Sequence, residues 1–110
     1  MALFRVAALP DSALTAAATF HAEILPHLPS GDDTLTLVFT PAGPSHRAWR
    51  LALVQALARE QAPRRVNALV GDDEAAIRQA ATFLETAAAI TGQLLMLDGA
   101  GSNPVVSSAA

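Results

Sequence analysis

The sequence predicts a small α/β domain in which about four mainly parallel strands alternate with three helices. Short runs of apolar and β-branched residues have the length and composition of buried strands. Between them lie longer segments in which apolar residues recur at helical spacing, and clusters of proline and glycine separate the segments. An alternation of strand and helix is typical of crossover units, which pair their strands in parallel.

The chain is expected to begin with a strand and a capped helix. A strand over residues 3–9 ends at Pro10, and Asp11 or Ser12 then caps a helix that runs to about Leu25. Pro26 lacks a backbone N–H, and with Pro29 it is expected to stop this helix. The other expected elements are a strand over 34–40, a helix capped by Ser45, a strand over 65–70, a helix after the acidic residues 72–74, and a strand over 93–97.

The two later helices each show an apolar stripe. In the second helix the stripe consists of Ala48, Trp49, Ala52, Leu53, Ala56 and Leu57. In the third helix it consists of Ile77, Ala80, Ala81 and Leu84. Trp49, Leu53 and Leu57 fit an oligomer contact as well as they fit the core of one chain.

Composition limits the classes of function. The 110 residues suit one domain, expected over 1–101, with a flexible tail over 102–110. Hydrophobic residues make up 52% and charged residues 15%, which indicates a folded chain. The net charge of -3 and the scattered arginines argue against nucleic acid. Without cysteine or an apolar segment long enough for a membrane, we expect a soluble cytoplasmic protein.

The topology also predicts oligomerisation. If each strand lies beside its predecessor and every crossover is right-handed, all helices fall on one face of the sheet. The other face of a parallel sheet would then lie bare, which such sheets avoid. A second copy covering that face, or pairing with the apolar edge strand 3–9, would solve the problem, so we expect a homo-oligomer, a dimer or larger.

Two segments resemble the short-chain dehydrogenase/reductase family. In the segment 57–71, Arg65, Val66, Asn67 and Ala68 match the family's "RVNA" strand. In the segment 80–99, Ile90, Thr91, Gly92, Gln93, Asp98 and Gly99 match its closing "iTGq…DG" pattern. The likeness covers about residues 20–101 and implies the C-terminal half of a Rossmann-like domain with oxidoreductase ancestry.

The chain departs from this family where the family does its chemistry. The resemblance places the family's Tyr-x-x-x-Lys pair, its general acid/base and the lysine that supports it, at about Gly43 and Arg47. The sequence contains no tyrosine and no lysine, and the family's substrate loop after Gly71 is cut short. Residues 1–30 contain no glycine, whereas the family's nucleotide turn is rich in glycine. We therefore expect no catalytic residue and no NAD(P).

Four residues remain as candidates for binding an anion or another ligand: Thr40, Ser45, His46 and Arg47. Ser45 to Arg47 open the second helix, where free N–H groups favour an anion. The alternative is a plain N-cap, and a Ser45–His46 nucleophile pair is disfavoured because helical neighbours point apart.

No metal site is expected. His21 and His27 are separated by Pro26 and do not share a helical face. Asp72, Asp73 and Glu74 suit helix capping better than metal binding.

These observations leave three hypotheses. The first is a non-catalytic, degenerate module that serves as an oligomeric scaffold or binds a protein partner. The second is an oxidoreductase or small-ligand enzyme whose site is completed across an oligomer interface. The third is a gene fragment without a selected function.

Overall fold

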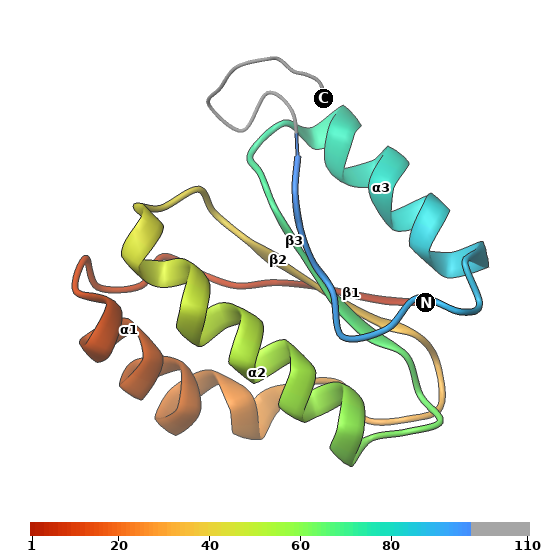
Figure 1. Ribbon diagram of the computed structural model, residues 1–110, viewed down its shortest axis with the longest axis horizontal. Helices are drawn as coiled ribbons and strands as arrows, with labels where there is room; N and C mark the ends of the chain where they lie inside the picture. The colour runs from red at the N-terminus through yellow and green to blue at the C-terminus, as the bar shows by residue number, and fades with distance from the viewer. Residues whose placement is uncertain (98–110) are drawn as a thin grey trace.

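Four strands form one parallel sheet in the chain order β1-β2-β3-β4 (Figure 1). The computed structural model describes residues 1–97, so the expected tail over 102–110 and the matched Asp98 and Gly99 lie outside the described residues. The strands are β1 (Ala2–Arg5), β2 (Leu35–Phe39), β3 (Val66–Val70) and β4 (Leu94–Met96), and the helices are α1 (Ala13–Thr19), α2 (Arg47–Glu60) and α3 (Glu74–Thr86). The predicted fold class is confirmed.

The two central strands form the middle of the molecule. Leu35 of β2 pairs with Val66 of β3, and the register continues to Phe39 beside Val70. Every residue of both strands is buried. This agrees with apolar and β-branched runs that lack polar alternation, because such strands are covered on both faces. The predicted bounds of these two strands and of β4 are correct to within one residue at each end.

Helices cover both faces of the sheet, so the predicted bare face is wrong. Figure 1 shows α1 and α2 on one side of the sheet and α3 on the other. Because the strands are parallel and lie in chain order, a crossover over the opposite face must have the opposite hand. The third crossover, through α3, therefore differs in hand from the first two, and our assumption of uniform right-handed crossovers fails there.

Each face has its own core. On the α1 and α2 side, inward residues of the sheet such as Leu37, Phe39 and Ala68 pack with Phe20 and Val54. On the α3 side, the buried residues are Val38, Leu69, Ile77, Ala81 and Leu84. Alternate residues of one strand enter different cores, as the pleat requires.

The first strand and helix differ from the prediction. β1 ends at Arg5, one residue before the Val6 N–H donates its bond to the Val38 carbonyl. Residues 7–11 then turn away, because β2 ends at Phe39 and offers few further partners. Ser12 provides the N-cap of α1 and accepts from the Thr15 N–H. After α1 the chain continues as a π-helix (Phe20–Ile24) and a 3₁₀ turn (Leu25–His27), so the helical backbone extends to the predicted end near Leu25 although it is not α-helical throughout.

The prediction for the start of the second helix is also wrong. Ser45 lies inside a 3₁₀ turn (Pro44–His46), and α2 follows directly without a side-chain cap. The buried face of α2 is rotated from the predicted stripe: Ala48 and Ala52 are exposed, and the buried residues are Arg50, Leu53, Val54, Leu57 and Ala58.

The third helix follows the prediction. Asp73 caps α3 by accepting from the Ala76 N–H at 3.0 Å, which confirms that the acidic residues serve as a cap. Ile77, Ala81 and Leu84 are its buried residues. Within residues 1–97, no helix has the length and apolar character needed to cross a membrane.

Candidate functional site

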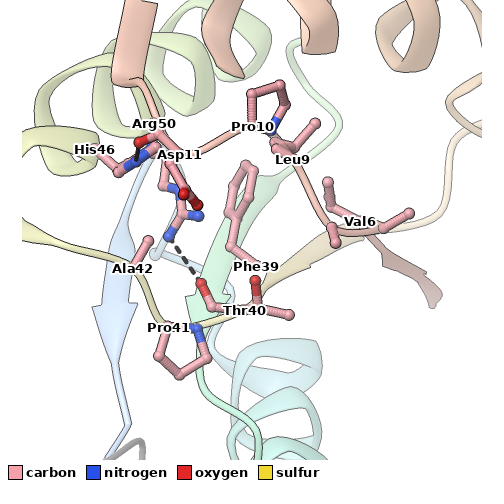
Figure 2. A pocket seen from close by; sticks show the side chains of 12 residues that line it. Val6, Leu9, Pro10, Asp11, Phe39, Thr40, Pro41, Ala42, His46 and Arg50 are labelled. Carbon is pink, nitrogen blue, oxygen red and sulfur yellow. Dashed lines mark hydrogen bonds between the residues drawn. The ribbon is translucent and has the colours of Figure 1, made fainter. Parts of the chain in front are cut away.

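A cavity of about 240 Å³ opens at the carboxyl ends of β1 and β2 (Figure 2). Its walls are the loop after β1, the end of β2 with the loop that follows, and the first turns of α2. In parallel α/β sheets this end of the strands is where ligands bind. The lining residues are Val6, Ala7, Ala8, Leu9, Pro10, Asp11, Phe39, Thr40, Pro41, Ala42, His46 and Arg50.

Arg50 reaches into this region from α2. Its side chain is 5% exposed, and Nη1 donates a hydrogen bond to the Thr40 carbonyl at 3.0 Å. The guanidinium carbon lies 4.6 Å from the centre of the Phe39 ring, a cation–π contact. Nε is buried and has no hydrogen-bond partner among residues 1–97. Burial lowers the pKa of Arg50 from its ordinary value, because desolvation penalises the charged form.

His46 ties the loop after β1 to α2. Its Nε2 lies 2.8 Å from the Asp11 carbonyl, and the Trp49 indole N–H donates to its Nδ1 at 3.2 Å. Since Nδ1 accepts, the proton resides on Nε2, which donates to the carbonyl. His46 therefore acts as a structural clamp, and its two nitrogens are both engaged.

The cavity brings together two of the four candidate residues. Thr40 and His46 both line it. Arg47 is exposed and lines a second, mostly apolar hollow of about 190 Å³, which shares Ala42, His46 and Arg50 with the first cavity. Ser45 is exposed and lines neither cavity.

Arg50 was missed, although the sequence carries a signal for it. Arg50, Leu53, Val54 and Leu57 follow the i, i+3, i+4, i+7 spacing of one helical face. A single charged residue on an otherwise apolar face is either a boundary of that face or a buried polar group with a specific role. The stripe predicted for the second helix contains only apolar residues, so it does not include Arg50.

The histidines and acidic residues stay apart. His21 is exposed, and its Nδ1 lies 2.8 Å from the Ala17 carbonyl; His27 is exposed as well. In the described part of the chain, no group of three or more potential ligands is placed to hold a metal ion.

The residues that carry the family resemblance meet at the opposite end of the sheet from the cavity. The Asn67 side chain donates to the Ile90 carbonyl and accepts from the Gln93 N–H, at 3.1 and 3.0 Å. The Thr91 hydroxyl accepts from the Val66 N–H at 3.0 Å. These contacts join the start of β3 to the turn that precedes β4.

The glycine of this turn has a conformational reason. Gly92 has φ of 75°, in the left-handed region that favours glycine, and its N–H donates to the Val66 carbonyl at 2.7 Å. The matched "RVNA" and "ITGQ" segments thus hold the start of β3 against the turn before β4. The similarity of these segments to the family reflects their role in maintaining the fold.

Comparison with known proteins agrees with this framework. Neither the curated proteins nor the solved structures contain a significant match to the chain. A family model described as "short chain dehydrogenase-like protein" matches residues 4–97, which is most of the 110 residues. The matched range includes all but the first two residues of β1 and every later strand and helix of the parallel sheet domain. The chain therefore belongs to the short-chain dehydrogenase-like family, with a Rossmann-type fold and an oxidoreductase-related ancestry.

Proposed function

We propose that this family member is a non-catalytic module that acts as an oligomeric scaffold or binds a protein partner. One observation carries the proposal: the positions that match the family's tyrosine and lysine are Gly43 and Arg47, and the chain contains neither residue type. Gly43 has no side chain that could transfer a proton, and Arg47 is exposed. Proton transfer by a positioned phenol has no substitute among these residues.

The cavity residues do not suit a dinucleotide, which supports the proposal that NAD(P) is not bound. Pro10 has no N–H to offer a phosphate, and the Asp11 carboxylate would repel one. The cavity, at about 240 Å³, is below the usual range of roughly 300–1,000 Å³ for drug-sized ligands, and a dinucleotide is larger still.

Titration with NADH and NADPH tests this part. Trp49 is the chain's one tryptophan, so quenching of its emission and energy transfer to the nicotinamide report binding directly. We expect no saturation at micromolar cofactor. Saturable micromolar binding of either cofactor would overturn the non-catalytic proposal and favour the alternative, an oxidoreductase whose site is completed across an oligomer interface.

The open edge of β1 supports a homo-oligomer. The N–H groups of Ala2 and Val6 point toward β2, where they donate to Thr34 and Val38. Because N–H directions alternate along a strand, the N–H of Arg5 faces the outer edge of the sheet. An edge of this kind can pair with another strand. Large exposed apolar side chains at Leu14, Phe83 and Met96 are further surfaces that a second chain would cover.

Light scattering over a dilution series tests assembly, and Arg5 offers a matched pair of variants. Arg5→Pro removes the outward N–H, whereas Arg5→Ala keeps it; both lose the ion pair of Arg5 with Glu74. If β1 pairs with a second copy, Arg5→Pro is monomeric and Arg5→Ala remains oligomeric, with circular dichroism confirming that both fold. A wild-type protein that stays monomeric at high concentration would refute the oligomer.

We also propose a cytoplasmic location, which the absence of cysteine supports.

A further inference from the structure

Arg50 differs from the other two arginines that are buried or half-buried. Arg64 donates to the carbonyls of Asp33 and Pro29 and to the Gln61 side chain. Arg65 makes four hydrogen bonds, three of them to main-chain carbonyls. Both guanidinium groups thus hold loops and helix ends together, and Arg64 does so although its Nη2 is buried without a partner among the described residues. Arg50 makes one hydrogen bond, to Thr40, although its side chain is only 5% exposed.

The charge of Arg50 also lacks an ionic partner. Within residues 1–97, no carboxylate lies within ion-pair distance of its guanidinium. The Nε–H is enclosed without an acceptor, and Nη2 makes no hydrogen bond to any described residue. Nη2 is not enclosed in this way, so it is the nitrogen that an anion in the cavity can reach. A buried, unpaired cation is costly, so an anion beside Nη2 would relieve a real deficit.

The cavity beside Arg50 indicates the size and character of that anion. Its volume of about 240 Å³ equals that of roughly eight water molecules. Val6, Leu9 and Phe39 give it an apolar wall, and Figure 2 shows the Arg50 guanidinium directed to Thr40. The site therefore combines one cationic group with an apolar surface, which suits a short chain with a charged end.

Asp11 restricts the charge of the ligand. Its carboxylate belongs to an exposed residue on the cavity wall and carries a negative charge. With one cation and one anion at the cavity, a ligand with a single negative charge is favoured over a doubly charged phosphate.

We propose that this cavity binds a small monocarboxylate, with the carboxylate on Nη2 of Arg50 and the apolar chain against Val6, Leu9 and Phe39. Binding is non-covalent and requires no cofactor or second chain. The proposal is independent of the proposed scaffold role, since a non-catalytic module can carry such a site as a monomer or as an oligomer.

Calorimetric titration with straight-chain monocarboxylates from acetate to hexanoate tests the proposal at constant ionic strength. We expect saturable binding that strengthens with chain length until the cavity is full. The uncharged amides of the same acids and inorganic phosphate are the comparison ligands, and they are expected to bind much more weakly. Phosphate binding tighter than every carboxylate, or no saturable binding of any carboxylate at millimolar concentration, would overturn the proposal.

Variants locate the site. Arg50→Met is expected to weaken the best carboxylate by about thirtyfold or more, because it removes one partner of a buried charge pair. Arg59→Met, nine residues later on the same helix, is the matched control: Arg59 is exposed, lines neither of the two cavities beside Arg50, and its loss should leave affinity unchanged. Asp11→Asn is expected to tighten binding about two- to fivefold by removing the negative charge on the wall.

A spectroscopic measurement on the wild-type protein keeps the test decisive if Arg50→Met does not fold. The Nε–H resonance of Arg50 should shift in a saturable manner on addition of the carboxylate, while that of Arg64 stays in place. Equal affinity of Arg50→Met and wild type, or an unchanged Arg50 resonance at saturation, would refute the site. Neither outcome depends on NADH binding or on the oligomeric state, so this proposal and the scaffold proposal can fail separately.

Discussion

Arg65 is expected to be among the most important polar residues for stability. Its Nη1 donates to the carbonyls of Leu84 and Ala87, both at 2.7 Å, and its Nη2 donates to the Glu85 carbonyl at 2.8 Å and to the Thr34 hydroxyl at 3.1 Å. A cation that satisfies the last carbonyls of a helix also opposes the helix dipole. One side chain at the start of β3 therefore holds the end of α3.

Loss of the Arg65 guanidinium is expected to destabilise the domain strongly. A hydrogen bond that involves a charged group contributes about 1.5–3 kcal/mol. The four bonds of Arg65 do not simply add, because the released carbonyls lie near the surface and regain water. We expect Arg65→Met to lower the free energy of unfolding by about 2–4 kcal/mol. At roughly 4–8 °C per kcal/mol for a domain of this size, the melting temperature should fall by about 8–32 °C.

Urea unfolding followed by far-ultraviolet circular dichroism measures this change, and amide exchange shows whether α3 loses protection first. Arg65→Lys should recover only part of the loss, because an ammonium group cannot span four acceptors. Arg59→Met is the control: Arg59 is exposed and makes no hydrogen bond through its side chain within residues 1–97. An Arg65→Met variant no less stable than Arg59→Met would refute the reasoning.

Three further predictions concern single contacts. Asn67→Leu leaves the Ile90 carbonyl and the Gln93 N–H without partners and should cost about 2–4 kcal/mol in urea unfolding; a neutral result would mean that water replaces the amide. Asp73→Ala should destabilise by about 0.5–2 kcal/mol and Asp73→Asn by much less, since asparagine also caps; equal losses in thermal melts would argue against the cap. Trp49→Phe removes the hydrogen bond to His46 and should cost about 0.5–1.5 kcal/mol in thermal melts, with no loss if the indole N–H bonds water equally well.

The strands could be predicted from the sequence because their environment is simple. β2 and β3 are buried on both faces, so a continuous apolar run marks them with little ambiguity. The cap at Asp73 was also predictable, because an acidic residue directly before an apolar helical stripe is typical of a helix N-cap. Both signals lie within one element and need no knowledge of its neighbours.

The errors concern relations between elements. The face on which α3 packs depends on the hand of its crossover, and the residues of α3 are equally able to cover either face. The rotation of α2 depends on Arg50, whose burial follows from the Phe39 ring and the Thr40 carbonyl on another element. The end of the first strand depends on where its partner stops. Each of these properties is fixed by tertiary packing, which a single element does not encode.

The division of the interior by the sheet has a consequence for how this chain can change in sequence. The core beneath α1 and α2 and the core beneath α3 share no buried residue, and only the backbone of the strands lies between them. The cavity beside Arg50 adjoins the first core, whereas the second core and the contacts between the start of β3 and the turn before β4 lie away from it. Substitutions that remodel the cavity are therefore expected to add to, rather than depend on, changes on the α3 side, so the cavity can vary in sequence while the α3 side stays the same.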